Sequence, residues 1–271
     1  MHHNPTIGDH PSTPRWAWSK VPEVTIYFWV IKIFATTVGE TAADYLNTSL
    51  GFGLTNTTIV TVVLLVISLA AQFAVRRYIP VLYWWLVVLI SVTGTLITDN
   101  LTDNFGVPLA VTTTIFSVAL IVVFSAWYLV EKTLSIHSIR TPRREAFYWL
   151  AILVTFALGT AAGDLIAEKL ALGYGWSLVL FAGLIAAITL GHFGLRLNAV
   201  LAFWAAYIIT RPLGASLGDL LTQPADAGGL GVGKTAVNIV FFAVIIGLVG
   251  YLIATKVDRL EPRTAQAEVP A

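Results

Sequence analysis

The chain has 271 residues, of which 57% are hydrophobic and only 11% are charged. Soluble domains are about 45–50% apolar and about 25% charged, so this composition excludes an ordinary soluble enzyme and indicates a protein that crosses a membrane several times. A net charge of +1 gives no argument for a nucleic-acid partner, and the absence of cysteine excludes disulfides, iron–sulfur clusters and thiolate metal sites.

Eight apolar stretches are long enough to cross about 30 Å of hydrocarbon as α-helices. We place them at residues 22–46, 56–75, 80–103, 108–131, 144–168, 176–194, 198–222 and 233–256. Residues 1–20 contain three prolines and no apolar run, so we expect a polar tail there rather than a cleavable signal peptide. A second polar tail is expected at residues 258–271.

Basic residues fall almost entirely on one side of the membrane under an eight-helix count. That side carries Arg15, Lys20, Arg76, Arg77, Lys132, Arg140, Arg143, Arg144, Arg196, Lys256, Arg259 and Arg263, whereas only Lys169 and Lys234 fall on the other. Because cytoplasmic loops are enriched in lysine and arginine, we predict a multi-pass protein of the cytoplasmic membrane with both termini in the cytoplasm. A seven-helix count would lose this asymmetry.

One motif occurs four times: an aromatic residue followed by Trp, then nine residues, Gly, four residues and Asp. The copies are Phe28-Trp29 with Gly39 and Asp44, Tyr83-Trp84 with Gly94 and Asp99, Tyr148-Trp149 with Gly159 and Asp164, and Phe203-Trp204 with Gly214 and Asp219. Successive copies are offset by 55, 65 and 55 residues. We therefore expect an internal duplication, with repeats 1 and 2 in residues 21–135 and repeats 3 and 4 in residues 136–257.

Each repeat contains two spans, so all four enter the membrane in the same direction. We therefore predict an all-α integral membrane protein whose eight transmembrane helices form four parallel two-helix repeats, with pseudo-symmetry about the membrane normal. Trp and Asp are about 22 Å apart along each helix, which puts Trp near the cytoplasmic boundary and Asp near the outer end. We expect the tryptophans to anchor at the interface, and Gly39, Gly94, Gly159 and Gly214 to let helices approach closely.

The acidic residues of the repeats are the main candidates for a site. Three copies carry a second acid four residues away on the same helix face: Glu40 with Asp44, Asp99 with Asp103, and Asp164 with Glu168. Like charges at that spacing repel unless they share a cation or a proton. Glu40 is near the bilayer centre and should therefore face the bundle interior and have a partner.

Packed around one axis, the four repeats would aim their carboxylates at the same level. We predict that these acids form a metal site whose ligands are Glu40, Asp44, Asp99, Asp103, Asp164 and Asp219. Oxygen ligands of this kind suit Mg²⁺, Mn²⁺ or Ca²⁺, or a relay of protons or Na⁺. The alternative is structural: each Asp ends its helix and pairs with a lysine or arginine.

Two basic residues lie within the spans. Lys32 is close enough to the cytoplasmic boundary for its ammonium group to reach the interface. Arg211 is deeper and precedes Pro212, which should bend its helix. We expect Arg211 and Pro212 to supply a counter-charge and a hinge, with Arg211 neutralising Glu40 or a repeat Asp when no cation is bound. Structural pairing without transport is the alternative for Arg211.

Four segments of the chain resemble a known bacterial group. They are GETAADYLN at 39–47, TGTLITDNLTDNFGVPL at 93–109, REAFYWLAILVTFALGTAAGDL at 144–165 and LNAVLAFWAAYIITRPLGASLGDLL at 197–221. The group consists of predicted membrane-anchored proteins built from a duplicated repeat of unknown function, and the resemblance covers about residues 20–257. It implies no established activity, so the functional hypothesis rests on the residues themselves.

Our leading hypothesis is a transporter or channel for a hard cation, with Mn²⁺ or Mg²⁺ as the first choice. The absence of an ATP-binding motif implies movement driven by a gradient. We expect no enzymatic activity and no covalent cofactor, and the expected partners are the lipid bilayer and the transported cation.

Two alternatives belong to other classes. One is a non-transporting membrane scaffold or sensor whose acids only hold helices together. The other is a proton- or sodium-coupled transporter of a small solute, which requires a midplane pocket with apolar walls. The ion, the direction of transport, its coupling, the oligomeric state (a homo-oligomer is one option) and the convergence of the four Asp residues stay open.

Overall fold

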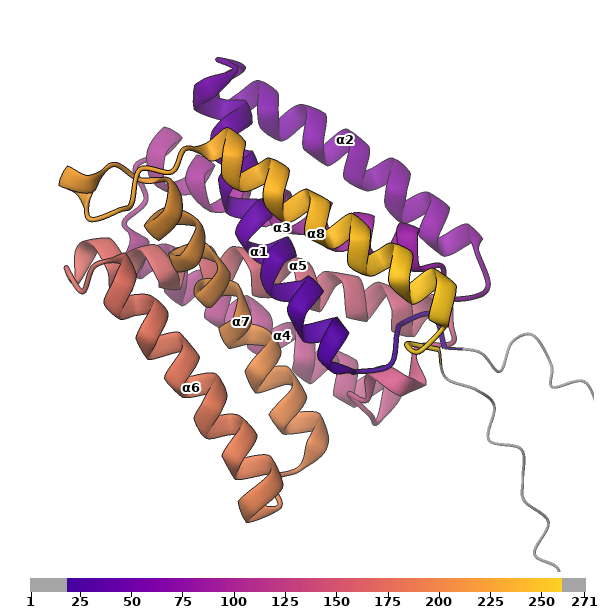
Figure 1. The fold of residues 1–271 in the computed structure, drawn as a ribbon. Coiled ribbons are helices and arrows are strands. Elements are labelled where there is room, and N and C mark those ends of the chain that lie inside the picture. The colour runs from indigo at the N-terminus through magenta and orange to yellow at the C-terminus, as the bar shows by residue number, and fades with distance from the viewer. Residues whose placement is uncertain (1–18, 260–271) are drawn as a thin grey trace, which may run out of the picture.

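The computed structural model describes residues 19–259, and all regular elements in that range are helices (Figure 1). The long helices are α1 (Ile26–Asp44), α2 (Gly53–Ala74), α3 (Pro80–Asp99), α4 (Leu109–Glu131), α5 (Pro142–Asp164), α6 (Tyr174–Leu195), α7 (Ala199–Thr222) and α8 (Lys234–Thr255). Each coincides with one predicted span to within a few residues at either end. Arg15, Arg263 and most of both predicted tails lie outside the described residues.

Seven of these helices, α2 to α8, are long and apolar enough to cross a membrane. The chain is therefore a multi-pass membrane protein. Helix α1 is not among the seven: its 19 residues include Lys32, Glu40 and Asp44, which lower its apolar character.

Local sequence signals set the helix ends. Thr25, Thr141 and Asn198 cap α1, α5 and α7 by accepting hydrogen bonds from backbone N–H groups of the first turn, and α3 begins with Pro80. Helices α4, α6 and α8 are each followed by a C-cap residue in the left-handed conformation: Lys132, Arg196 and Lys256. A positive side chain there is favourable at a helix C-terminus.

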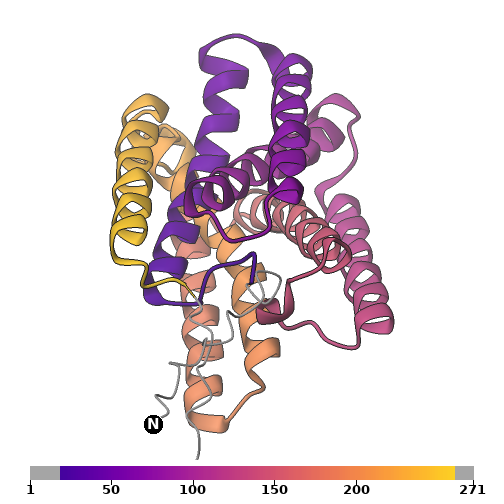
Figure 2. The same ribbon diagram turned by 90° about the vertical axis from the view of Figure 1, so that its right-hand side faces the viewer.

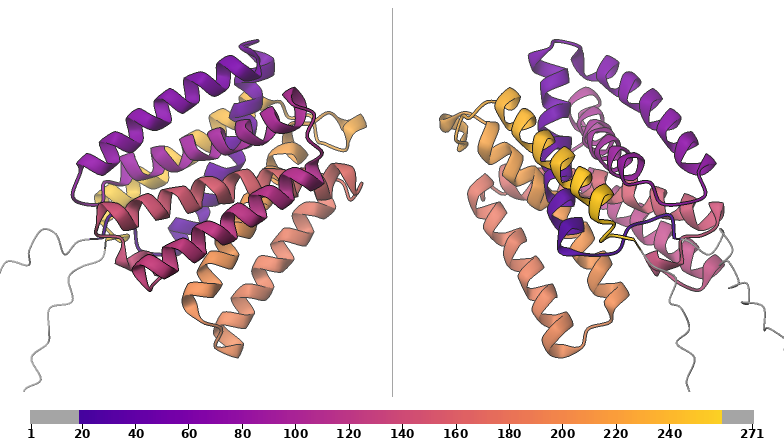
Figure 3. Two further views of the ribbon diagram at one scale, coloured as in Figure 1. Left: turned by 180° about the vertical axis from the view of Figure 1, so that it is seen from behind. Right: turned by 45° about the vertical axis from the view of Figure 1, so that its right-hand side comes forward.

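The odd-numbered helices form a ring in which α1 contacts α3 and α7, and α5 contacts the same two helices. Each even-numbered helix packs on the outside against the first helix of the following repeat: α2 on α3, α4 on α5, α6 on α7, and α8 on α1 (Figures 1 and 2). Seen from behind, α2, α3, α5 and α4 lie side by side in that order (Figure 3). The last repeat thus contacts the first and closes the ring.

The repeat glycines lie where neighbouring odd helices touch. A Cβ atom on any of them would overlap a side chain of the next helix in the ring. The pairs are Gly39 with Ser91, Gly94 with Phe156, Gly159 with Arg211, and Gly214 with Thr36. The partner is always three residues before the glycine of the next repeat, so one contact recurs at all four junctions and lets the backbones approach closely.

Three of the four repeat tryptophans differ from the prediction of interfacial anchors. Trp84, Trp149 and Trp204 are buried inside the protein, and they pack with Tyr83 and Tyr148, whose hydroxyls are 2.5 Å apart. The reason is geometric: fifteen residues at about 100° each place Trp within about 60° of the Asp on its helix, so both lie toward the inside of the ring. Aromatic side chains therefore fill one end of the ring.

Substitution of Gly159 tests this packing. We expect Gly159→Ala to destabilise the protein by about 1–3 kcal/mol, because the new methyl group overlaps Arg211. Gly163→Ala is the matched control on the same helix, since its Cβ would lie at an ordinary 3.5 Å from Pro212. Thermal unfolding of the detergent-purified variants measures both changes. Equal melting temperatures for the two variants would contradict the proposed close contact.

Candidate functional site

The side chain of Arg211 is at the point where the four odd helices meet. It is 0% exposed on α7 and donates to a partner on each of the other three. Its Nη2 is 2.9 Å from Glu40 Oε2 of α1 and 2.7 Å from Thr160 Oγ1 of α5, and it also donates to Thr95 Oγ1 of α3. Nη1 is 3.4 Å from the carbonyl oxygen of Thr36. One guanidinium therefore links all four repeats.

The partners of Arg211 occupy equivalent positions. Glu40, Thr95 and Thr160 each directly follow the glycine of their repeat, and Ala215 has that position in the fourth. The two threonine hydroxyls also lie 3.2 Å from the carbonyl oxygens of Ser91 and Phe156, to which they donate, leaving their lone pairs for the arginine. A single repeat position thus supplies one carboxylate and two hydroxyls to one cation.

Arg211 and Glu40 form a buried, charge-neutral pair. Their side chains are 0% and 9% exposed. The prediction that Glu40 faces the interior and has a partner fits this geometry. Removing either member of such a pair leaves an uncompensated buried charge, whereas the intact pair is electrostatically balanced.

Lys32 differs from the prediction of an ammonium group at the interface. It is 0% exposed, and its Nζ donates to the carbonyl oxygen of Tyr207 at 3.0 Å and lies 3.9 Å from the centroid of the Tyr207 ring. Phe28, Lys32, Thr36 and Glu40 are spaced by four residues, so they share the inward face of α1. The side chain is therefore directed into the ring instead of along the lipid face.

The predicted metal ligands lie toward the end of the ring opposite the aromatic side chains. Asp219 is buried, Asp44, Asp99 and Asp164 are partly exposed, and Asp103 is exposed. Asp44 pairs with Lys234 at 2.8 Å. Within residues 19–259, Asp99, Asp164 and Asp219 form no ion pair with a lysine or arginine.

These carboxylates converge only in part. Asp99, Asp164 and Asp219 are each within electrostatic range of Glu40, and Asp99 and Asp219 also of Asp44. In the part of the chain that the structure describes, however, no three acidic or histidine side chains are close enough to hold one metal ion. The structure brings the repeat acids to one region of the ring without forming a metal-binding cluster from them.

A π-helical turn follows the α-helix that carries the repeat Asp in three of the four repeats. Asp44, Asp99 and Asp164 are the last residues of their α-helices and are followed by five-residue π turns at 45–49, 100–104 and 165–169. Asp103 and Glu168 lie in these turns and are exposed, and each remains within electrostatic range of the first acid of its repeat. The sequence pattern carries no signal for these turns.

Pro212 does not interrupt its helix, since α7 is continuous from Ala199 to Thr222. The proline instead packs against α5: a Cβ on Gly159 would lie 3.0 Å from its Cδ, and one on Gly163 would lie 3.5 Å from its Cβ. Pro212 therefore helps to position the neighbouring Arg211 against α5.

A cavity of about 620 Å³ lies between α1, α6 and α7 on the side of the ring that carries the aromatic residues. Its walls are mostly apolar and include Trp29, Ile33, Ile185, Ile188 and Phe203, and it extends to Thr210, next to Arg211. A pocket with apolar walls is what the solute-transporter alternative requires, and no local sequence pattern indicates where it lies.

The fold and the shared arginine define an all-helical, multi-pass membrane protein built from four repeats. A family described as Repeat of Unknown Function (DUF347) matches residues 27–78, 82–133, 147–196 and 202–258, and each match contains one copy of the motif. These matches cover most of the chain, so the protein belongs to this family, and the predicted resemblance is confirmed. No curated protein and no solved structure matches the chain.

A double-mutant cycle on Arg211 and Glu40 tests the buried pair. We expect Arg211→Gln and Glu40→Gln each to lower the free energy of unfolding by about 3–5 kcal/mol, and the double variant to lose clearly less than the sum. Asp44→Asn is the control, because the Asp44–Lys234 pair is about a quarter exposed and should be worth about 0–1 kcal/mol. Additive losses in thermal unfolding would show that the two side chains do not depend on each other.

Proposed function

We propose that the protein is a transporter or channel of the cytoplasmic membrane for a hard cation, with Mn²⁺ or Mg²⁺ as the first choice. One observation carries the proposal: equivalent positions of the first three repeats, Glu40, Thr95 and Thr160, meet Arg211 of the fourth, with Asp99, Asp164 and Asp219 close by and unpaired within residues 19–259.

In this proposal α1 is the eighth span, and both termini are cytoplasmic. Its buried Lys32 and Glu40 face the ring rather than lipid, which favours insertion of a helix with charged residues. The closed ring, in which each even helix covers the next odd helix, supports four parallel repeats arranged about the membrane normal.

The unpaired carboxylates would attract a cation from the outer side. The parts of the chain that we place toward the outer side of the membrane contain only two basic residues, Lys169 and Lys234. They contain eight acidic residues: Glu40, Asp44, Asp99, Asp103, Asp164, Glu168, Asp219 and Asp226. A cation that binds Glu40 through Oε2 would compete with the guanidinium of Arg211, which donates to that oxygen. Arg211 would therefore occupy the site in the ion-free protein, and Thr95 and Thr160 would add neutral oxygen ligands once it moves.

The other end of this path is closed. Tyr83, Trp84, Tyr148 and Trp149 fill the ring, and the Lys32 side chain lies against the rings of Phe156 and Tyr207. Passage of a cation would require the odd helices to move apart at this end. This favours a carrier that opens to one side of the membrane at a time over a continuously open channel.

Specific observations favour two other functions. The apolar-walled cavity next to Thr210 suits a proton- or sodium-coupled transporter of a small solute. The buried Arg211–Glu40 ion pair, and the lack of a metal-binding group among residues 19–259, suit a non-transporting scaffold or sensor.

Ion-dependent stability of the detergent-purified protein separates these functions. A panel of Mn²⁺, Mg²⁺, Ca²⁺, Zn²⁺ and Na⁺ should contain one ion that raises stability selectively, by about 2.7 kcal/mol at a hundredfold excess over its Kd. We expect Glu40→Gln and Asp164→Asn to abolish that shift and the flux of the same ion into proteoliposomes. Asp226→Asn is the control, because its exposed carboxylate is in the loop before α8.

If no ion shifts the stability and Glu40→Gln changes only the assembly or melting of the protein, the cation proposal is wrong and the scaffold is favoured. If no ion has an effect but a small apolar solute stabilises the protein, the solute transporter is favoured.

A further inference from the structure

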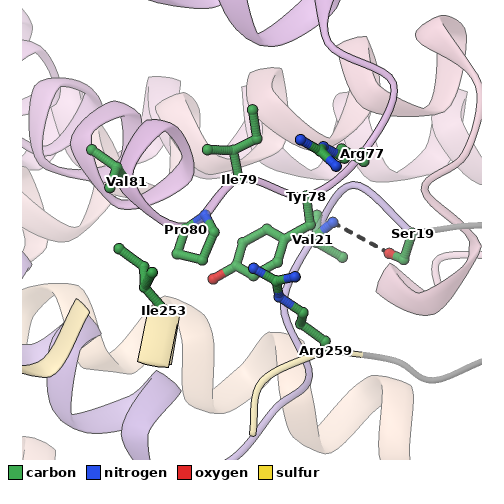
Figure 4. Close-up of a pocket in the computed structure, with 9 residues that line it drawn as sticks. All are labelled: Ser19, Val21, Arg77, Tyr78, Ile79, Pro80, Val81, Ile253 and Arg259. Carbon is green, nitrogen blue, oxygen red and sulfur yellow. Dashed lines mark hydrogen bonds between the residues drawn. The ribbon is translucent and has the colours of Figure 1, made fainter. Parts of the chain in front are cut away.

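A second cavity, separate from the ring, lies at the end of the molecule where residues 19–25, the loop between α2 and α3, and the segment after α8 meet (Figure 4). Its volume is about 270 Å³. The lining residues are Ser19, Val21, Arg77, Tyr78, Ile79, Pro80, Val81, Ile253 and Arg259. Basic side chains and apolar side chains therefore line the same cavity.

The cavity is at the boundary between the membrane-spanning helices and their connections. Pro80 and Val81 begin α3, and Ile253 is in the last turn of α8. Val81 and Ile253 are 57% and 43% exposed on the outside of the bundle, where hydrocarbon chains contact a membrane protein. Arg77 and Arg259 lie just outside the two helices, at the level where lipid headgroups are found.

The two arginines are available for a ligand. Within residues 19–259 neither forms an ion pair, and Arg259 Nε is buried without a hydrogen-bond partner. Figure 4 shows Arg259 reaching toward Tyr78 from the C-terminal segment, with Arg77 on the loop above it. Two guanidinium groups from different segments thus line one small cavity.

An acid next to two lining residues already has a partner. Asp258 is buried beside Arg259, and its Oδ2 accepts a hydrogen bond of 2.6 Å from the hydroxyl of Tyr78. Burial also raises the pKa of the Asp258 carboxyl, which disfavours its charged form. An anion would therefore compete with Asp258 for Arg259. No acidic side chain of residues 19–259 forms an ion pair with Arg77, so an anion there would have no such competitor.

We propose that this cavity binds the phosphate group of an anionic phospholipid, with the acyl chains lying against Val81 and Ile253. Guanidinium groups bind phosphate oxygens through paired, charge-assisted hydrogen bonds. The cavity is slightly smaller than the roughly 300–1,000 Å³ of sites that enclose a whole small molecule, so it suits a headgroup whose chains remain outside. A zwitterionic lipid is disfavoured because both arginines repel its headgroup cation.

The bound lipid would join three segments that are distant in sequence. The backbone N–H of Glu23 already donates to the carbonyl oxygen of Asp258 at 2.9 Å, and Tyr78 contacts Asp258 from the α2–α3 loop. A phosphate held by Arg77 and Arg259 adds a further link between the loop and the C-terminal segment. This role is independent of what the ring transports.

Lipid titration of the full-length, delipidated protein in detergent tests the site. Short-chain phosphatidylglycerol should raise the melting temperature, whereas short-chain phosphatidylcholine and inorganic phosphate at the same concentrations should not. Arg77→Gln and Arg259→Gln should each weaken the apparent affinity for phosphatidylglycerol by about tenfold or more. Arg76→Gln is the matched control, because this exposed neighbour does not line the cavity.

Arg77 is exposed, so Arg77→Gln should fold even if the Arg259 variant does not. Arg259→Lys keeps the charge but loses the paired hydrogen bonds, and we expect it to retain part of the affinity. The site is refuted if Arg77→Gln binds phosphatidylglycerol as tightly as Arg76→Gln does. An equal shift with phosphatidylcholine, or with inorganic phosphate alone, would likewise overturn an anionic lipid as the ligand.

Discussion

The need to satisfy one buried guanidinium organises the interior of this protein. Arg211 is fully buried at membrane depth, where an unpaired charge is strongly unfavourable, so its donors require acceptors from several helices at the same level. Those acceptors reach it only because the odd helices approach closely, and the repeat glycines allow that approach. Gly159 has a particular importance, since it contacts the arginine side chain itself. The close packing of the odd helices and the hydrogen bonding of Arg211 therefore depend on each other.

The four repeats keep the residues of the Trp–Gly–Asp motif and differ at the two positions that surround the Arg211 guanidinium. Trp, Gly and Asp recur in all four copies, whereas the position after the glycine is Glu40, Thr95, Thr160 or Ala215. The position three residues before the glycine is Thr36, Ser91, Phe156 or Arg211. Four copies of one scaffold thus produce a single asymmetric site: the fourth repeat supplies the cation, the first the anion, and the second and third the hydroxyls.

Much of this architecture could be predicted because it depends on local patterns. Span length, basic-residue asymmetry and the Trp–Gly–Asp spacing predicted the helices and repeats, and the depth of Glu40 required a partner for it. What could not be predicted depends on how helices rotate and end. The inward direction of Lys32 and of Trp84, Trp149 and Trp204 follows from which helix face meets the ring, and the π turns that contain Asp103 and Glu168 follow from no local sequence signal. Both cavities are formed by segments distant in sequence, which no local pattern reveals.

The double role of Arg211 also limits how the ring can move. Its methylene groups pack against Gly159 of α5 while its guanidinium binds Glu40 of α1, so a displacement of α7 relative to either helix changes both contacts. Pro212 strengthens this link, because it contacts α5 immediately beside the arginine and leaves one backbone carbonyl of α7 without its usual helical donor. A ligand that takes Glu40 from Arg211 would therefore release a packing contact between α5 and α7 as well as an ion pair. Binding at the carboxylates would in this way be transmitted to the relative position of the helices.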